Sequence, residues 1–286
     1  MSRIVKRFNL TIPILISIVF FFISFVMAEE TFEINTFLMR STFKIIGENS
    51  IGTVFILGKP CKENPDKAYY VLITATHVLA NMKGDKATLF LRKKINNLYE
   101  KLPWEISIRK EGENLWINHP EVDVSAMYIA LPIDIDIALL PIGILADDET
   151  FNKFEIHPGD ELLCLGYPFS AEANKAGFPI LRSGKIASFP IVPAKETKSF
   201  LFDFEVFKGN SGGPVYFVQS TARAYGGATH IGTIQFIAGL VSEEHIITEE
   251  ITSLYEKQMK AYPLALAKVI HASFIKETIE MLPSID

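Results

Sequence analysis

Cysteine is scarce in this chain of 286 residues, which contains only Cys61 and Cys164. Cys164 lies within the apolar run 162–165, and this setting predicts a buried structural thiol. Cys61 lies in a polar loop, which favours a free thiol over a bridge. The fold is therefore not expected to depend on a disulfide, although disulfides are permitted outside the cytoplasm.

Basic clusters and metal-ligand motifs are also missing. The formal net charge is −5, and Arg92–Lys94 is the only basic triplet after the N-terminal leader, which we interpret as the solvated face of a hairpin. This composition excludes the electrostatic footprint of a nucleic-acid-binding protein, so no nucleic acid partner is expected. The histidines show neither HExxH nor another ligand spacing, so no metal and no other cofactor is predicted.

Charged residues are absent from one long run, residues 8–28, which is mostly apolar. Arg3, Lys6 and Arg7 precede this run and Ala28 ends it, which is the pattern of a signal peptide with its cleavage site. The run is longer than the usual signal-peptide core, and about 20 apolar residues can span a bilayer, so a retained membrane anchor is the alternative. In both cases the rest of the chain is expected to be exported, to the periplasm or the extracellular space.

The residues after Ala28 are sufficient for two β-barrels of about 120 to 130 residues each, or for one large domain. Hydrophobic residues make up 49% of the chain, so a core is easily filled. From Phe32 onward, short β-rich runs alternate with turn residues. The expected strands are 41–46, 51–57, 68–74, 87–92, 104–109, 124–131, 161–168, 179–188, 199–203, 214–218 and 231–242, followed by a loop with a short helix at 243–256 and a helix at 264–282.

The segment from Phe207 to Val215 carries Ser211 between small residues. A glycine two places before this serine and two glycines directly after it suit a tight turn, which presents a hydroxyl and two backbone amides to one point. This is the pattern of a nucleophile beside an oxyanion hole. A hydroxyl is a weak nucleophile until a base removes its proton, so a histidine and an acid that orients it are expected upstream.

The string GNSGGP at 209–214 resembles the nucleophile loop of trypsin-like serine peptidases, the chymotrypsin-fold superfamily. The string ATHV at 75–78 resembles the segment that carries the catalytic histidine in that superfamily, so His77 is the expected base. Thr76 and Val54 depart from the family pattern, and neither change removes the chemistry. An isolated histidine is usually structural, but one at a strand end, a barrel length before GNSGGP, is interpreted as functional.

Two aspartates compete for the role of the acid. Asp123 precedes the apolar run 124–131, whereas Asp136 begins the string DIALL, which is closer in wording to the DVA or DIA segment of the family. The longer run and the spacing to the second barrel favour Asp123, which would accept a hydrogen bond from Nδ1 of the histidine. Asp136 remains the alternative, and the acid that is not used is expected to be an exposed loop carboxylate.

The resemblance implies an all-β fold of two antiparallel six-stranded β-barrels with a C-terminal helix. After a leader at 1–28, residues 29–140 would form the barrel with the histidine and the aspartate. Residues 141–286 would form the barrel with the serine and end in the helix. The GYP string at 166–168 is closest in style to the peptidase domains of bacterial high-temperature-requirement proteins, here expected without a PDZ domain.

The same resemblance implies a serine endopeptidase that cleaves polypeptide substrates through an acyl-enzyme. Its triad would be His77, Asp123 and Ser211, and the backbone amides of Gly209 and Ser211 would form the oxyanion hole. Asn210 replaces the aspartate that pairs with a new N-terminal ammonium in digestive members of the superfamily. A neutral amide cannot balance that charge, so activity without proteolytic activation is expected.

Two further residues bear on the substrate. Ser242 ends the string GLVS, which resembles the GIVS strand that forms one wall of the substrate channel. Glu205 falls where the resemblance places the base of the primary specificity pocket, where an acid would favour lysine or arginine; alternatively it points to solvent or forms a salt bridge. A catalytically silent homologue that binds peptides or acts as a scaffold is the second hypothesis for the whole protein, and the intact serine, histidine and aspartate argue against it.

Overall fold

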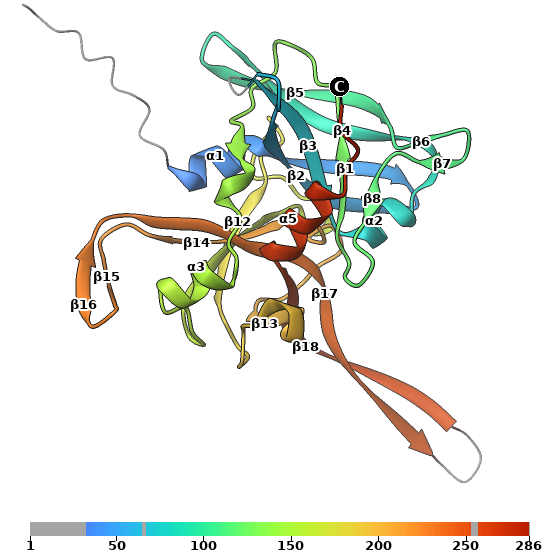
Figure 1. The fold of residues 1–286 in the computed structure, drawn as a ribbon. Coiled ribbons are helices and arrows are strands. Elements are labelled where there is room, and N and C mark those ends of the chain that lie inside the picture. The colour runs from blue at the N-terminus through green and yellow to red at the C-terminus, as the bar shows by residue number, and fades with distance from the viewer. Residues whose placement is uncertain (1–32, 65–66, 253–256, 286) are drawn as a thin grey trace, which may run out of the picture. The chain divides into compact units, whose positions relative to one another are not determined.

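The computed structural model describes residues 33–64, 67–252 and 257–285. The predicted leader and its possible membrane tether at 8–28 lie outside these residues. Two mainly antiparallel sheets make up most of the described part, with few helices (Figure 1). Of the helices in these ranges, none is both long and apolar enough to cross a bilayer.

The first sheet has eight strands, in the order β5-β4-β1-β2-β3-β9-β8, with the short β10 paired to β2. Two very short strands, β6 and β7, form a separate hairpin after β5. The bounds are β1 (Thr42–Glu48), β2 (Ser50–Pro60), β3 (Ala68–Thr74), β4 (Lys83–Ile95), β5 (Leu98–Ser107), β6 (Arg109–Lys110), β7 (Glu113–Asn114), β8 (Ile117–Asn118), β9 (Ser125–Tyr128) and β10 (Leu140–Pro141).

The second sheet has six strands, in the order β12-β11-β14-β17-β18-β13. A bridge between Ile186 and Phe202 joins the two outer strands of this order and closes the sheet on itself. The bounds are β11 (Glu161–Gly166), β12 (Ile180–Lys185), β13 (Ser199–Asp203), β14 (Pro214–Gln219), β17 (Ile234–Thr252) and β18 (Lys257–His271), and a separate hairpin is formed by β15 (Ala222–Tyr225) and β16 (Ala228–Ile231).

The all-β, chymotrypsin-like double-barrel fold with a C-terminal helix is confirmed. The first sheet has eight strands rather than six, because the short β8 and β10 add to the expected set. The predicted boundary between residues 140 and 141 falls inside β10, which pairs with the first sheet. The helices are α1 (Ile34–Ser41), α2 (Thr76–Ala80), α3 (Asp148–Lys153), α4 (Ala194–Thr197) and α5 (Ala272–Glu280), with 3₁₀ turns at Ile142–Ile144 and Pro168–Ser170.

Helix α1 was not predicted from the sequence, and its capping explains why it forms. The Glu33 carboxylate accepts hydrogen bonds from the backbone amides of Asn35 at 3.0 Å and Thr36 at 2.9 Å. Such a cap satisfies amides that have no partner inside the helix. Ile34 and Leu38, one turn apart, are buried on the same face, so the helix joins the first core.

The interpretation of Arg92 as part of a solvated hairpin face is wrong, because its side chain is 0% exposed. Its guanidinium donates to the carbonyl oxygens of Met39, Thr42 and Gly177 at 2.9 to 3.0 Å. It also lies 4.4 Å from the ring centroid of Phe43. Carbonyl acceptors and an aromatic face satisfy a buried cation that composition alone assigns to the surface.

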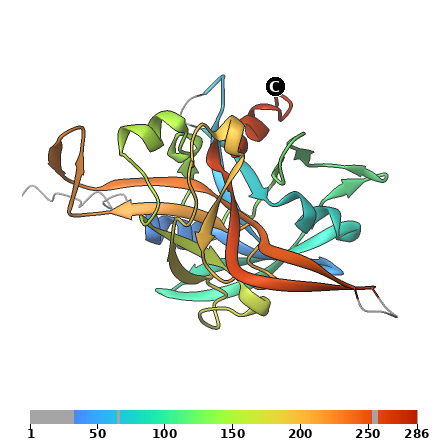
Figure 2. The same ribbon diagram turned by 90° about the horizontal axis from the view of Figure 1, so that it is seen from below.

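Three expectations for secondary structure are wrong. The segment 243–256 was expected to contain a short helix, but β17 continues to Thr252 and pairs with β18 down to Thr252 opposite Lys257. Together these strands extend as an arm beyond the rest of their sheet (Figures 1 and 2). The expected strand 124–131 is only the four-residue β9.

The predicted helix at 264–282 begins only at Ala272. Leu266, Val269 and Ile270 have helical spacing in the sequence, but all three belong to β18. Ala267 and Val269 are buried while Lys268 between them is not, which is the period of two that a strand requires. The remaining helix, α5, places Phe274 and its neighbours in the same apolar core as the first sheet.

His271, at the start of α5, predicts a loss of stability in acid. Its side chain is 1% exposed and lies between the rings of Phe151 and Phe200, at centroid distances of 5.4 and 5.1 Å. Burial lowers the pKa of His271 from 6.5 to about 4. As the pH falls from 6.5 toward 4, His271 therefore binds a proton in the unfolded chain but not in the folded chain. The free energy of unfolding falls by about 3 kcal/mol over this window.

Urea unfolding of the wild type and of His271→Gln at pH 7.5 and pH 4.5 measures this effect. The variant is expected to lose less stability between the two values, because its side chain does not titrate. Every other titrating group is common to both proteins and cancels from the comparison. An equal loss in both proteins would contradict the prediction.

Candidate functional site

The ends of two paired strands bring His77 and Asp123 together. Thr74 at the end of β3 pairs with Ser125 at the start of β9, so the residues just beyond these ends are neighbours. The sequence turns into α2 at residue 76, which places His77 in its first turn. His77 Nδ1 lies 2.7 Å from Asp123 Oδ2, a charge-assisted hydrogen-bond distance.

Two more donors hold the Asp123 carboxylate. The backbone amide of His77 donates to Oδ1 at 3.0 Å, and the Ser242 hydroxyl donates to Oδ2 at 2.6 Å. Ser242 comes from β17 of the second sheet, so the acid is fixed from both sheets. Burial acts to raise the pKa of Asp123, but the hydrogen bonds from His77 and Ser242 outweigh it and lower the pKa below the ordinary value.

The imidazole of His77 is set up to take a proton. Burial acts to lower the pKa of His77, but the hydrogen bond and the negative charge of Asp123 outweigh it and raise the pKa above 6.5. The His77 side chain is 41% exposed, so its ring also meets solvent. Since Nδ1 is directed to the carboxylate, the proton-accepting atom is Nε2.

The turn around Ser211 leaves two amides without a partner. The amides of Asn210 and Gly213 donate to the carbonyl oxygens of Phe207 and Asn210, each at 2.9 Å. Within the ranges that the structure describes, the amides of Gly209 and Ser211 donate to no protein acceptor. These are the two amides that the sequence predicted for an oxyanion hole, and both are available to an incoming oxygen.

Hydrogen bonds from both sheets hold this turn. The amide of Thr53 on β2 donates to the Ser211 carbonyl at 2.9 Å. The amide of Gly212 donates to the Val241 carbonyl at 2.7 Å, and the amide of Val241 donates back to the Gly213 carbonyl at 2.9 Å. The turn around Ser211 is therefore fixed between the two sheets, and β17, the strand that holds it on one side, also supplies Ser242.

Two positions in the turn require glycine. Gly209 has a φ of +102°, and a Cβ there would lie 2.2 Å from the carbonyl oxygen of Tyr167. Gly212 has a φ of +85°, and a Cβ there would lie 2.1 Å from the carbonyl oxygen of Thr53. Both the backbone conformation and the lack of space exclude a side chain.

Gly52 lies close both to Ser211 and to the helix that carries His77. A Cβ on Gly52 would lie 2.5 Å from the side chain of Val78, the residue after His77, and 3.2 Å from the Ser211 carbonyl oxygen. In the described part of the chain, no hydrogen bond joins the Ser211 hydroxyl to the His77 imidazole. Catalytic hydrogen bonds are often long in enzymes without substrate and tighten when it binds.

A cleft of about 650 Å³ opens beside the pair of His77 and Asp123. Two ion pairs line it, between Glu121 and Lys198 at 3.0 Å and between Glu243 and Lys268 at 3.2 Å. The first pair joins a loop of the first barrel to the end of α4. The cleft is thus walled by residues of both barrels, and Ser211 is not among its lining residues.

Asp136, the alternative acid, makes a different contact. Its carboxylate accepts from Arg40 Nη2 at 2.8 Å and from Arg40 Nε at 3.1 Å, and the residue is 8% exposed. The expectation that the unused acid is an exposed loop carboxylate is therefore wrong. A two-pronged arginine contact satisfies this carboxylate, and it ties α1 to the segment that leads to β10.

His119 supports the loop that carries Asp123, a role that was not predicted from the sequence. Its Nδ1 accepts from the amide of Glu121 at 3.2 Å, and its Nε2 lies 3.3 Å from Glu277 Oε2 on α5. The ring also packs edge-on against Phe274 at 5.0 Å. Helix α5 thereby holds the loop that carries Asp123. The only sequence signal was a histidine four residues before that acid.

Glu205 lies on the surface. The residue is exposed, and its backbone carbonyl accepts a hydrogen bond from Arg182 Nη1 at 2.7 Å. In the described residues its carboxylate makes neither an ion pair nor a hydrogen bond. Across the same ranges, no group of three or more histidine, cysteine, aspartate and glutamate side chains is placed to hold a metal ion.

Asn210 is buried beside Ser211, and this burial predicts an effect on stability. The residue is 1% exposed, and in the described residues its Oδ1 has no hydrogen-bond partner. Asn210→Asp would bury a carboxylate there without a cation, which we expect to lower the free energy of unfolding by about 3 kcal/mol at pH 7.5. The loss is expected to shrink toward pH 4, because protonation removes the charge.

Chemical denaturation at both pH values tests the Asn210 prediction. Asn210→Ala is the matched control, since it removes the amide without adding a charge. Its loss of stability is expected to be independent of pH between 7.5 and 4. A pH-independent loss in Asn210→Asp would show that the charge is not the cause.

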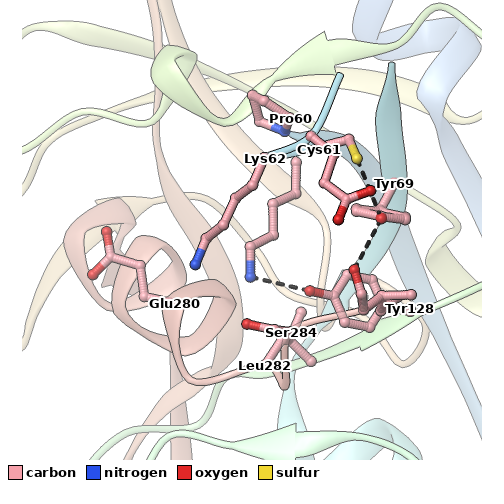
Figure 3. Close-up of a pocket in the computed structure, with 11 residues that line it drawn as sticks. Pro60, Cys61, Lys62, Tyr69, Tyr128, Glu280, Leu282 and Ser284 are labelled. Atoms are coloured by element: carbon pink, nitrogen blue, oxygen red, sulfur yellow. Dashed lines mark hydrogen bonds between the residues drawn. The ribbon is translucent and has the colours of Figure 1, made fainter. Parts of the chain in front are cut away.

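A second pocket, of about 270 Å³, is not lined by His77, Asp123 or Ser211 (Figure 3). Cys61 Sγ lies 3.3 Å from the hydroxyl of Tyr69, which in turn donates to the Ile285 carbonyl at 3.1 Å. The Tyr128 hydroxyl donates to the Pro283 carbonyl at 3.1 Å. These contacts fix residues 283–285 against β3 and β9. Both thiols are free, and Cys164 is buried, as the sequence predicted.

This chain is similar to solved structures, but not to a protein family or a curated protein. No protein family and no curated protein matches the sequence. Among solved structures, a mutant, inactive form of Rv3671c from M. tuberculosis H37Rv is similar over 85% of this chain and 86% of that chain, with 15% identity and a TM-score of 0.42. Protease Anisep from Arthrobacter nicotinovorans is similar over 84% of this chain and 93% of that chain, with 12% identity and a TM-score of 0.47. What the site can do therefore follows from its own geometry.

Proposed function

We propose that this protein is an exported serine endopeptidase that hydrolyses peptide bonds through Ser211, His77 and Asp123. The contact between His77 Nδ1 and Asp123 Oδ2, at 2.7 Å, carries the proposal. A histidine oriented by a half-buried acid at the edge of a cleft is the arrangement that general base catalysis needs. Further support comes from β17, because this strand is hydrogen-bonded to the turn around Ser211 and also supplies the Ser242 hydroxyl to Asp123.

In the proposed mechanism, the Ser211 hydroxyl attacks the carbonyl carbon of a peptide bond. His77 Nε2 takes the hydroxyl proton as the bond forms and returns it to the leaving amine as the peptide bond breaks. Asp123 keeps the proton on Nδ1 and stabilises the imidazolium that forms. Water then attacks the acyl-enzyme by the same route, with His77 again as the base, and releases Ser211 and the new carboxylate.

The free amides of Gly209 and Ser211 would stabilise the negative oxygen of the tetrahedral intermediate. Each such donor contributes about 10² to 10³ to the rate in comparable enzymes. The rigid turn keeps both amides in place before the substrate arrives, so no reorganisation is needed.

Covalent labelling tests the proposal. A fluorophosphonate probe is expected to label the wild type at one site, and Ser211→Ala is expected to remain unlabelled while folding normally by circular dichroism. His77→Ala should label much more slowly, because the hydroxyl loses its base. Labelling of Ser211→Ala, or none of a folded wild type, would overturn the assignment of the nucleophile.

The second candidate is a catalytically silent homologue that binds peptides or acts as a scaffold. The lack of a hydrogen bond between Ser211 and His77 in the described residues is the observation in its favour. A folded wild type that binds peptides but shows neither labelling nor cleavage would support it. An unbiased peptide library, with Ser211→Ala as the control, separates the two candidates and defines the natural preference.

Export and activation are parts of the same proposal. Mass spectrometry of the mature protein is expected to find a chain that begins after Ala28, or the uncleaved chain in a membrane fraction if residues 8–28 remain as an anchor. We also propose activity without an internal cut, because Asn210 carries no charge to pair with a new ammonium. An essential internal cleavage before activity appears would contradict this.

A further inference from the structure

The loop at Tyr167–Ala171 packs directly on the nucleophile turn. The amide of Phe169 donates to the carbonyl of Lys208 at 2.7 Å. The Tyr167 carbonyl lies so close to Gly209 that no Cβ fits there. The loop is therefore in contact with the residues on either side of the peptide bond that carries the Gly209 amide.

Phe169 is exposed and strained at once. Its side chain is 72% exposed, although it is a large aromatic group. Its φ is +51°, and the next residue, Ser170, has a φ of +68°. Two consecutive residues other than glycine in the left-handed region are unfavourable, and bulky residues are rare there. Backbone strain of this kind concentrates at functional sites, and here no burial of the side chain offsets it.

The Phe169 ring packs against the ring of Phe207, which precedes the nucleophile turn. Its centroid is 5.0 Å from that of Phe207, with 34° between the ring planes. The guanidinium of Arg182 lies 5.2 Å from the Phe207 ring and 4.1 Å from that of Phe204. We call Phe169 and Phe207 together the aromatic rim. Phe207 lies two residues before Gly209 in the chain.

We propose that this aromatic rim binds a large apolar or aromatic side chain of the substrate, next to the peptide bond that is cleaved. The inference rests on the proposed function, because it assigns a subsite of the same cleavage reaction. Aromatic rings attract other apolar and aromatic groups through stacking and loss of hydrated surface. Arg182 already lies at the Phe207 ring, so its positive charge disfavours a lysine or arginine of the substrate there.

Cleavage of matched peptides tests the rim. Each pair of peptides differs at one residue that flanks the scissile bond: one member has phenylalanine or leucine there and the other has serine. One set of pairs varies the residue before the bond, and a second set varies the residue after it. The wild type is expected to prefer the apolar member at one flanking position by about tenfold or more in kcat/KM. Phe169→Ala is expected to reduce that preference about tenfold, with cleavage of the serine peptide changed less than threefold. Phe169→Leu should keep most of the preference.

Ile231→Ala is the matched control. Ile231 is 91% exposed on β16, which belongs to a separate two-stranded sheet, so the variant also removes exposed apolar surface. The control is expected to keep the preference. Equal preference in the wild type and Phe169→Ala, or no preference at either flanking position, would overturn the assignment of the rim.

Fluorophosphonate labelling separates a failure of this inference from a failure of the proposed function. Labelling of Ser211 is expected both in the wild type and in Phe169→Ala, because the probe carries no large flanking side chain. If both proteins are labelled and the preference is unchanged, only the rim is wrong. If neither is labelled, the peptidase assignment itself fails, and the rim as a cleavage subsite fails with it.

Discussion

Asp123→Asn is expected to lower kcat about 10⁴-fold while leaving the fold intact. In the wild type, Oδ1 accepts the His77 amide, and Oδ2 accepts both the Ser242 hydroxyl and His77 Nδ1. If the asparagine oxygen keeps the place of Oδ1, its NH₂ group faces Nδ1. The imidazole must then carry its proton on Nε2, where it cannot accept the proton of Ser211.

The same substitution is expected to change the titration of His77. The pKa of His77 is raised because the hydrogen bond and charge of Asp123 outweigh the effect of burial. Without that charge, burial remains, so the pKa is expected to fall below its wild-type value. NMR titration of the His77 ring in both proteins measures the shift, and an unchanged pKa would contradict the assigned partner.

Asp136→Asn is the matched control for Asp123→Asn. Asp136 pairs with Arg40 and is 8% exposed, so the variant is expected to lose about 2 kcal/mol of unfolding free energy. Its kcat/KM is expected to stay within about threefold of the wild type. The reverse result, in which Asp136→Asn loses activity and Asp123→Asn keeps it, would assign the acid to Asp136.

Gly209→Ala is expected to reduce kcat about 10²- to 10³-fold with a smaller effect on KM. A Cβ at this position would lie 2.2 Å from the Tyr167 carbonyl oxygen, so the turn must move and carry the amide with it. The amide of Gly209 would stabilise charge only in the transition state, which is why kcat and not binding is affected. Steady-state kinetics with one peptide substrate measures the division between kcat and KM.

Gly159→Ala is the matched control for the backbone effect. Gly159 has a φ of +91°, close to the +102° of Gly209, but a Cβ there would meet nothing within 4 Å. This variant is expected to lose about 1 kcal/mol of stability and to keep its activity. Equal losses of activity in the two glycine variants would trace the defect to general destabilisation and not to the oxyanion site.

The fold was predictable where local patterns are unambiguous. Alternating apolar runs separated by turn residues predicted the strands around Ser41–Leu57 and Ala68–Thr74, and they lie close to the observed β1, β2 and β3. The prediction failed at Leu266, Val269 and Ile270, because three apolar residues at this spacing suit one face of a helix or a mixed strand equally well. Pairing with β17 decides for the strand, and no local signal encodes that pairing.

The candidate site was predictable in residue type but not in every contact. The small residues around Ser211 predicted a tight turn with two available amides, and the glycine requirement at Gly209 and Gly212 follows from the same crowding. Ser242 was expected to form a wall of the channel, and its hydroxyl also donates to Asp123. The support of the acid by His119 was missed, because it depends on α5, more than 150 residues further along the chain.

By itself, the sequence determined the β-rich fold class, the tight turn around Ser211 and the strand-end position of His77, because these depend on residues adjacent in the chain. Only the tertiary structure decided which aspartate reaches His77, why Arg92 is buried, and how β17 brings Ser242 to Asp123. Contacts between distant segments depend on strand pairing and side-chain packing. A carboxylate beside an imidazole and a carboxylate beside Arg40 look alike until the chain has folded around them.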